Sequence, residues 1–557
     1  MINSTTMKRI INNKYFLGLT LLILGTSCTE LDLHYQGGEM DDEQLTETTS
    51  AIPKRADAAI AGMYSLLGKP YVYFGEDSER ADDMGYVSVC MGQDLNSGDM
   101  TNIVSGYDWF SVALELSDRT PTYANPQIRY GLFYKLLYAT QDVLSLIPDE
   151  TDNQELMFKR GQAKAMRAFS YLSLAPYFQF KYKGNEDKLS VPMVKEGVDP
   201  RKNPRVTLEV LYASIIDDLT SAISDLDGFN RSNKGLINQS VAYGLRARAY
   251  LNMEMWEEAA EDASKAMVGF TPYGISDLTS PGFNEASDPS WIWALLIPAD
   301  VAGQELATWP SQLGSFSGFG YVAYAGVWRS INKMLYDKIP DSDVRKQWWL
   351  NKDTASTYLD NLSWVDVSSN ITYTGSDIPG AVIADVKVKM DPYTNVKFGQ
   401  RAGVGSANND GDWAMMRVEE MILLRAEAVA KSGDLAGGKQ ILEDFVKTYR
   451  NPTFVSTASS LESFESEIWF QRRVELWGEG HAMSDVMRLG KNVVRYHPNK
   501  PTNVPEAYQF NISADDPWLL LRFVQKETTN NSAIVQNTGG SQPDSGDGAQ
   551  LLDGVTD

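Results

Sequence analysis

The sequence predicts a mostly α-helical protein in which helical hairpins form the frame and an irregular, loop-rich region with short strands interrupts it. Two observations indicate this. Apolar and small residues recur at helical spacing over the ranges 155–180, 206–226 and 239–268, and helical patterns return in the C-terminal third. Between about 270 and 410 the chain is instead rich in glycine, serine, proline and aromatic residues without a helical period, apart from one short helix that we expect around 329–338.

A short sequence pattern repeats on three of the predicted helices. It occurs as Leu245-Arg-Ala-Arg-Ala-Tyr250 and Leu424-Arg-Ala-Glu-Ala-Val429, and in a shorter form as Met166-Arg-Ala-Phe169. Around the first copy, small and aromatic residues follow the spacing of tetratricopeptide repeats, in which small side chains let paired helices approach closely. The second copy continues to a glycine at Gly438 on the next helix. The set predicts a tetratricopeptide-like scaffold, and for any single copy generic packing of alanine-rich helices is the alternative.

Composition and charge exclude several classes of partner. The 557 residues carry a net charge of −23, which repels phosphate backbones, so nucleic acid is not an expected ligand. Two cysteines and three histidines are too few for a zinc or iron–sulfur site, and we expect no cofactor. Calcium needs only oxygen ligands, which Asn408-Asn-Asp-Gly-Asp412 could supply. That segment lacks the downstream glutamate of a calcium loop, and Asp412 is alternatively the N-cap of a following helix.

The N-terminus predicts export and a lipid anchor. Lys8, Arg9 and Lys14 precede an apolar run over 15–24, which is too short to span a bilayer but typical of a secretory signal. The run ends in Leu24-Gly-Thr-Ser-Cys28, which resembles the lipobox of bacterial lipoproteins, although the leucine lies four residues before the cysteine rather than three. We therefore expect lipidation at Cys28; ordinary cleavage nearby is the alternative.

The remaining cysteine, Cys90, is then without a disulfide partner, and its apolar neighbours predict a buried structural thiol. No other apolar run reaches about 18 residues, so the lipid is the expected membrane anchor. We expect six parts in the chain: a signal peptide (1–27), a lipidated flexible tether (28–50), an N-terminal helical region (51–270), a loop-rich region (271–410), a C-terminal helical region (411–538) and a disordered tail (539–557).

Several separated segments resemble one family. These are Ala163-Lys-Ala-Met-Arg-Ala-Phe-Ser-Tyr-Leu172, Val191-Pro-Met-Val194, Met416-Arg-Val-Glu-Glu-Met-Ile-Leu-Leu-Arg-Ala-Glu-Ala428 and Gln471-Arg-Arg-Val-Glu-Leu-Trp-Gly-Glu-Gly-His481. In this order along the chain they resemble the SusD/RagB family of outer-membrane nutrient-binding lipoproteins, with Ala482-Met483 where that family has an aromatic residue after the histidine.

The resemblance implies a non-catalytic lipoprotein on the outer membrane, facing the cell exterior. Such a protein binds a nutrient, usually an oligosaccharide and sometimes a peptide. It caps a SusC-like TonB-dependent transporter and delivers the ligand into it.

A charged cluster near residue 480 could also suggest catalysis, because carboxylates beside a histidine are general acid and base groups. The spacing favours a structural role, since Arg472 with Glu475 and Asp485 with Arg488 form i,i+3 pairs that would stabilise a helical corner. An exported glycan-cleaving enzyme stays open as the alternative function, because sequence alone does not show which carboxylates face each other.

Candidate ligand residues lie in two loop-like stretches, 82–109 and 309–328. Sugars present apolar C–H faces ringed by hydroxyls, so a site needs flat aromatic rings and polar side chains nearby. Seven of the thirteen tryptophans fall between 291 and 364, which favours the second stretch. For each aromatic residue, core packing is the alternative, and Trp109 and Trp309 are the preferred candidates. The predicted site consists of Asp83, Asn96, Tyr107, Trp109, Trp309, Phe316, Tyr321 and Tyr324.

Overall fold

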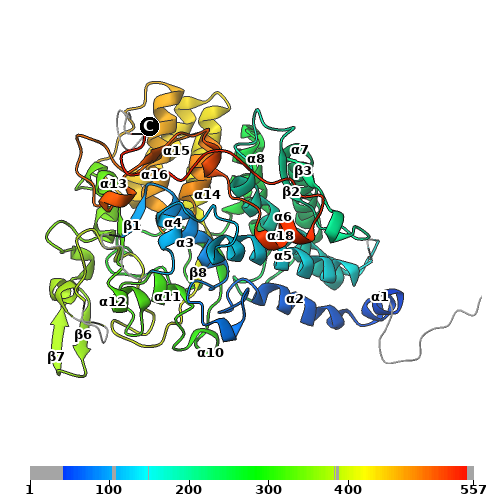
Figure 1. Cartoon of the computed structure of the whole chain (residues 1–557), viewed down its shortest axis with the longest axis horizontal. Coiled ribbons are helices and arrows are strands. Elements are labelled where there is room, and N and C mark those ends of the chain that lie inside the picture. Colours follow the sequence, from blue (N-terminus) through cyan, green and yellow to red (C-terminus); the bar gives the residue numbers. More distant parts are fainter. Residues whose placement is uncertain (1–41, 103–107, 149, 382, 384–387, 549–557) are drawn as a thin grey trace, which may run out of the picture.

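The computed structural model describes residues 42–102, 108–148, 150–381, 383 and 388–548. The predicted lipidation site at Cys28 and the candidate ligand residue Tyr107 lie outside these ranges. Helices dominate, and strands occur as short antiparallel pairs, so the predicted mostly α-helical class is confirmed (Figure 1). None of the helices within the described ranges is long and apolar enough to cross a membrane.

The N-terminal helices are α1 (Asp42–Ala51), α2 (Asp57–Ser65), α3 (Tyr86–Asn96), α4 (Ser111–Leu114), α5 (Ala124–Ser145), α6 (Gln154–Phe178), α7 (Leu208–Asp225), α8 (Gln239–Asn252) and α9 (Trp256–Ala266). The middle of the chain contains α10 (Ala299–Ala302), α11 (Trp309–Gln312), α12 (Tyr321–Ala325) and α13 (Lys333–Lys338). The C-terminal helices are α14 (Val418–Lys431), α15 (Leu435–Tyr449), α16 (Leu461–Glu475), α17 (Ala482–Leu489) and α18 (Gln525–Asn530).

The strands form five antiparallel pairs within the described residues: β1 (Met100–Asn102) with β5 (Arg329–Ile331), β2 (Leu189–Pro192) with β3 (Arg205–Thr207), β4 (Trp291–Leu295) with β8 (Trp413–Arg417), β6 (Ser363–Asp366) with β7 (Ile371–Thr374), and β9 (Val493–Val494) with β10 (Asn511–Ile512).

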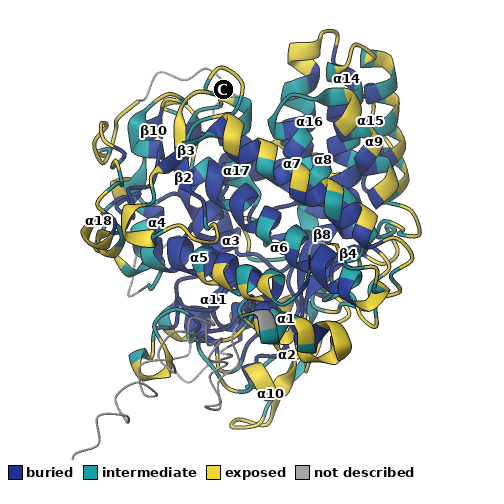
Figure 2. Ribbon diagram, turned by 90° about the vertical axis from the view of Figure 1, so that its right-hand side faces the viewer, coloured by how far each residue is buried: buried dark blue, intermediate teal, exposed yellow. Residues whose placement is uncertain are grey.

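The predicted hairpins form one continuous stack. Helix α6 packs on α7, α8 on α9 and α14 on α15, while α14 also packs on α9, so hairpins about 150 residues apart in sequence are neighbours (Figure 2). Small residues permit the close approach: a Cβ atom added at Gly438 would lie 2.6 Å from the carbonyl oxygen of Ala426. The tetratricopeptide-like prediction is therefore confirmed.

Local sequence explains where these helices begin. The side chains of Asn153, Thr207, Asn238 and Asp434 each accept a hydrogen bond from a backbone N–H in the first turn of α6, α7, α8 and α15, respectively. Such N-caps satisfy donors that have no partner within the helix, and each typically contributes about 1 kcal/mol.

The irregular region is an insertion between α9 and α14 whose two ends return to the same place. Strand β4 enters the insertion and β8 leaves it, and they pair with Trp291 opposite Arg417. Six of the seven tryptophans between 291 and 364 are buried, and only Trp364 among them is partly exposed. The aromatic enrichment of this stretch therefore mostly builds its core.

Some local expectations differ from the structure. The helix expected around 329–338 begins as β5, and α13 starts only after Asn332, whose side chain caps it by accepting a hydrogen bond from Met334 N at 3.0 Å. The N-cap prediction for Asp412 is wrong, because a strand follows. Its carboxylate instead accepts hydrogen bonds from Ala286 N and Ile297 N, both at 3.0 Å.

The chain ends also differ from expectation where they are described. Residues 42–50, placed in the flexible tether, belong to α1. Residues 539–548, placed in the disordered tail, are held by hydrogen bonds such as Asn511 N to Asp547 O at 2.9 Å and Tyr496 Oη to Gly546 O at 2.8 Å. Cys90 is 1% exposed on α3, and burial raises the pKa of its thiol, so the prediction of a buried thiol is confirmed.

Candidate functional site

The two loop stretches predicted to carry the ligand site meet in space. The ring centroid of Trp109 lies 6.4 Å from that of Tyr321, the first residue of α12. Pairing of β1 with β5 brings the stretches together, and Arg329 on β5 secures the contact through an ion pair of 2.8 Å with Asp108. Burial alone would raise the pKa of Asp108, but the adjacent Arg329 lowers it overall, so this pair stays charged beside the tryptophan.

An arginine of the segment between α2 and α3 (66–85), here called the N-terminal loop, extends this aromatic contact. The Arg80 guanidinium carbon lies 4.8 Å from the Trp109 ring centroid and 5.6 Å from that of Phe74, within the range of cation–π attraction. A bidentate ion pair with Asp82, at 2.8 and 3.0 Å, fixes the guanidinium. Sequence reasoning missed both Arg80 and Phe74, because nothing local to either residue indicates a partner about 30 positions away.

We call this set of side chains the aromatic surface: Phe74, Arg80, Trp109, Phe319, Tyr321 and Tyr324. Tyr324 lies one helical turn beyond Tyr321 and is 56% exposed, and Phe319 is 41% exposed. Tyr321 itself is 7% exposed and Trp109 is partly exposed. The set therefore combines rings that are held in place with rings that are open to solvent.

A surface hollow of about 790 Å³ adjoins the aromatic surface at Phe319. Its other walls come from the N-terminal loop, including Tyr71 and Glu79, and from Asp300 and Glu305 near α10. The Tyr71 hydroxyl donates a 2.9 Å hydrogen bond to Glu305, which joins the two walls. The volume is within the range of about 300–1,000 Å³ for ligand sites, and the lining offers ring faces with carboxylate acceptors.

Two of the predicted aromatic residues lie in the core. Trp309 is 1% exposed, its Nε1 donates a 2.7 Å hydrogen bond to Gly411 O, and its ring packs against Phe398 and Trp413. Phe316 is likewise 1% exposed. For both residues the structure shows core packing, which was the alternative to ligand contact in the sequence analysis. Neither presents an open ring face in this structure.

The predicted polar residues are also buried, and one of them, Asp83, shapes a loop of the site. The Asp83 carboxylate accepts hydrogen bonds from the backbone N–H groups of Tyr73 and Phe74, at 2.9 and 2.8 Å, and so shapes the loop that carries Phe74. Asn96 bridges Asp118 and Arg129 at 2.9 and 3.0 Å. Both side chains are 0% exposed, so direct contact with a ligand would need movement of the loops around them.

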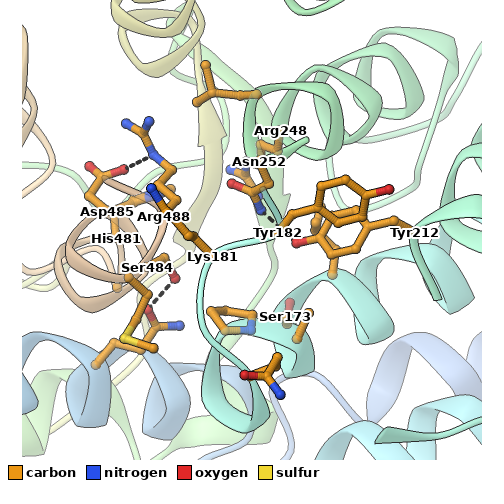
Figure 3. Close-up of a pocket in the computed structure, with 18 of the residues that line it drawn as sticks. Ser173, Lys181, Tyr182, Tyr212, Arg248, Asn252, His481, Ser484, Asp485 and Arg488 are labelled. Atoms are coloured by element: carbon orange, nitrogen blue, oxygen red, sulfur yellow. Dashed lines mark hydrogen bonds and ion pairs between the residues drawn. The ribbon is translucent and has the colours of Figure 1, made fainter. Parts of the chain in front are cut away.

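The charged cluster near residue 480 borders a separate pocket of about 100 Å³ between α6, α8, α14 and α17 (Figure 3). Its charged side chains neutralise one another: Asp485 pairs with Arg472 and Arg488 at 2.7 and 2.8 Å, and Glu420 pairs with Arg248. The predicted pairing of Asp485 with Arg488 is thus confirmed.

The predicted pairing of Arg472 with Glu475 is wrong. Glu475 instead contacts Arg345, Arg417 and Arg450, at 3.3, 3.2 and 2.7 Å, because its side chain points into the junction of the insertion with α16. These are long-range contacts that no helical spacing reveals.

The protonation states in this cluster fit a structural network. Burial lowers the pKa of His481 to about 4, so the imidazole is neutral near pH 7. Burial would raise the pKa of Glu420, yet Arg248 lowers it overall and keeps the carboxylate ionised. The pocket is well below the usual size of ligand sites, and its charges serve to join helices.

The calcium-loop candidate is occupied by internal contacts. Arg401 pairs with Asp410 and Asp412 at 3.3 and 2.7 Å, and Asn408 donates a hydrogen bond to Asp410. In the described ranges, no group of three or more histidine, cysteine, aspartate or glutamate side chains is arranged to hold a metal ion.

Comparison with known proteins identifies the fold and the family. One family model, described as the SusD family, matches residues 329–539, and a second, described as starch-binding associating with outer membrane, matches residues 74–251. A search of curated proteins gave no significant match.

Solved structures with this fold are similar over nearly their whole length. A SusD-like carbohydrate binding protein from Bacteroides vulgatus is 22% identical with a TM-score of 0.68, and 87% of this chain and 98% of that chain are covered. A SusD superfamily protein from Bacteroides thetaiotaomicron is 22% identical with a TM-score of 0.64, covering 87% and 99%. A laminarin binding SusD-like protein is 18% identical with a TM-score of 0.57, again covering 87% and 99%. The two family models together match residues 74–251 and 329–539, so the chain belongs to the SusD/RagB family.

Proposed function

We propose that this protein is a non-catalytic outer-membrane lipoprotein that binds a nutrient oligosaccharide on the aromatic surface. It is anchored through Cys28, faces the cell exterior, and passes the glycan to a SusC-like TonB-dependent transporter that it caps. The observation that carries the proposal is the Trp109–Tyr321 pair, extended by Arg80, with the exposed Tyr324 one helical turn beyond Tyr321. Phe319, two residues before Tyr321 in the chain, lines a hollow of about 790 Å³.

The chemistry of this surface suits a sugar. Tyrosine and tryptophan faces contact the apolar C–H side of a pyranose ring, while Arg80 and the carboxylates of Glu79 and Glu305 can bond its hydroxyls. Relatives point the same way, since one matching family model is described as starch-binding and one similar structure as laminarin binding. The proposed site therefore keeps the partly exposed Trp109 and the exposed Tyr324, with the buried Tyr321 as the ring that supports Trp109. It leaves out Trp309 and Phe316, which are 1% exposed.

Binding is favoured over cleavage because the histidine-carboxylate cluster near residue 480 is paired internally and lies at a pocket of only about 100 Å³. The experiment that tests this is incubation of the purified protein with starch and laminarin oligosaccharides, followed by measurement of reducing ends. No turnover is expected, and sustained release of reducing ends would establish the alternative, an exported glycan-cleaving enzyme.

The site is tested by calorimetric titration of the same oligosaccharides. Trp109→Ala and Tyr324→Ala should each weaken binding about five-fold, since one stacking contact contributes about 1 kcal/mol. Trp309→Phe is the matched control, because it alters a buried ring: it should lower the melting temperature while the folded protein binds normally. Normal affinity in both Trp109→Ala and Tyr324→Ala would refute the site, and binding of peptides in place of oligosaccharides would change the ligand class.

The partner is tested separately. We expect an outer-membrane barrel to co-purify with the protein after gentle extraction of native membranes, and protease treatment of intact cells should degrade it. Recovery as a free monomer that is protected from external protease would contradict this part of the proposal.

A further inference from the structure

A second aromatic depression lies where the N-terminal loop meets α5, at Tyr73. We call it the tyrosine pocket; it has a volume of about 290 Å³ and lies between α5, α18 and the loop that carries Tyr73 and Phe74. Its lining includes four tyrosines and a set of charged and amide side chains: Tyr73, Tyr130, Tyr134, Tyr138, Asn203, Lys526, Glu527, Asn530 and Asn531.

The rings of this pocket are rigidly supported. Tyr134 stacks on Tyr130 with centroids 4.4 Å apart, and its hydroxyl donates a 2.8 Å hydrogen bond to Pro192 O. Tyr73 occupies the space left by Gly131 on α5, where an added Cβ would lie 1.9 Å from its ring. Tyr138, in contrast, is 47% exposed. The pocket thus presents an open ring beside a preformed wall, which keeps the cost of ordering on binding low.

Polar groups surround these rings with both signs of charge. Lys526 lies 5.6 Å from the Tyr73 ring and 5.9 Å from the Phe74 ring, and Glu527 beside it accepts a 2.8 Å hydrogen bond from Asn531. Two ammonium groups, Lys526 and Lys135, line the pocket with a carboxylate and amides, and Lys135 already donates a hydrogen bond to Val72 O. The exposed tyrosine is thus surrounded by both donors and acceptors. This combination fits the hydroxyls and apolar face of a neutral sugar.

Contacts between neighbouring side chains connect the tyrosine pocket to the aromatic surface. The Arg80 guanidinium carbon lies 4.8 Å from the Trp109 ring centroid and 5.6 Å from the Phe74 ring centroid. The ring centroids of Phe74 and Tyr73 are 4.7 Å apart. The last ring lines the tyrosine pocket. Each step is comparable to the size of one sugar unit, so a short glycan chain could contact both places at once.

We propose that the tyrosine pocket is a second sugar subsite, and that a glycan bound at the aromatic surface continues over Phe74 and Tyr73 into it. The inference rests on the proposed function, and it adds that the protein selects oligosaccharides by length. Two linked contacts on one ligand raise affinity because the second forms within the complex.

The test is calorimetric titration with malto- and laminari-oligosaccharides of two to eight units. Wild-type affinity should rise with length, and Tyr138→Ala should reduce the affinity for the longest ligands about five-fold while leaving that for the shortest unchanged. Trp109→Ala should weaken binding at every length. Tyr123→Ala, which alters a tyrosine of 40% exposure that does not line the pocket, is the matched control and should have no effect.

The outcomes separate the two proposals. If Tyr138→Ala binds every length as the wild type does while Trp109→Ala is impaired, the second subsite is refuted and the proposed function stands. If the wild type binds none of these oligosaccharides, or if Trp109→Ala binds normally, the proposed ligand site itself fails. Thermal melts of each variant confirm that it is folded.

Discussion

Asp94 on α3 shows how burial sets the properties of a single side chain in this protein. It is 1% exposed, and burial raises its pKa to about 8, even though Gly480 N and Ala482 N donate hydrogen bonds to it at 3.1 and 3.3 Å. The carboxyl is therefore largely neutral in the folded protein at pH 7. Asp94 thus holds the turn before α17 through hydrogen bonds from backbone N–H groups rather than through an ion pair.

We predict that Asp94→Asn stabilises the protein at neutral and mildly alkaline pH. In the unfolded chain this carboxyl loses its proton near pH 3.8, whereas the folded protein holds the proton up to about pH 8. The wild type therefore loses about 5 kcal/mol of stability as pH rises from 4 to 8. The amide removes this loss but has a single acceptor oxygen, so it gives up one of the two backbone hydrogen bonds. We expect a net gain of about 2–4 kcal/mol at pH 8. Urea unfolding of both proteins at pH 4.5 and pH 8 checks it. Parallel pH dependence in the two proteins would contradict the prediction.

For Glu475 on α16 we predict the opposite effect, a loss of stability when the carboxylate is replaced by an amide, because its negative charge balances buried arginines. It is 0% exposed among Arg345, Arg417 and Arg450, and although burial opposes ionisation, these arginines hold the pKa of Glu475 well below its usual range. Glu475→Gln leaves buried guanidinium charge uncompensated, so we expect a loss of about 3–5 kcal/mol in the free energy of unfolding.

The control is Glu257→Gln on the exposed side of α9, which should change stability by no more than about 0.5 kcal/mol. Denaturant unfolding measures both effects, and titration with oligosaccharide should show normal affinity in the folded fraction of the Glu475 variant. An unchanged stability would contradict this structural role of Glu475, and a binding defect at full stability would indicate a direct functional role instead.

At the scale of elements, close approach of α14 and α15 depends on a residue without a side chain. A Cβ atom at Gly438 would lie 2.6 Å from both the carbonyl oxygen of Ala426 and the Cβ of Ala430. Gly438→Ala should therefore force the two helices apart and cost about 1–3 kcal/mol, despite the better helix propensity of alanine.

The matched control is Gly62→Ala on α2, where an added Cβ meets nothing within 4 Å. There the propensity of alanine should dominate and increase stability by about 0.5–1 kcal/mol. Thermal unfolding of the two variants should shift in opposite directions. Equal stabilisation would show that the α14–α15 contact is less tight than the structure indicates.

At the scale of the whole molecule, the proposed lipid anchor at Cys28 would decide where the protein acts. We predict that Cys28→Ala leaves the fold intact but releases the protein in soluble form, since the proposed lipidation site lies outside the described residues and makes none of the contacts described above. Fractionation of cells with immunodetection measures this. Retention of the variant in the membrane fraction would show that the segment over 24–28 does not work as a lipobox.

The sequence alone determined the helical frame and the family. Helical periodicity and small residues at fixed spacing are local signals, so the hairpins α6–α7, α8–α9 and α14–α15 could be predicted from short windows. The sequence also predicted that residues near 109 and 321 belong to one site, and the structure places these two rings 6.4 Å apart.

Only the tertiary structure decided which side chains are open to a ligand. The sequence favours Trp309 over Tyr324 as a ligand residue, yet Trp309 is 1% exposed and Tyr324 56%. The difference arises from contacts about 100 residues away, where Gly411 and Trp413 enclose the Trp309 ring. Arg80 likewise becomes part of the site only because folding brings it to Trp109. Ring exposure is a property of long-range packing, and a linear pattern contains no direct signal for it.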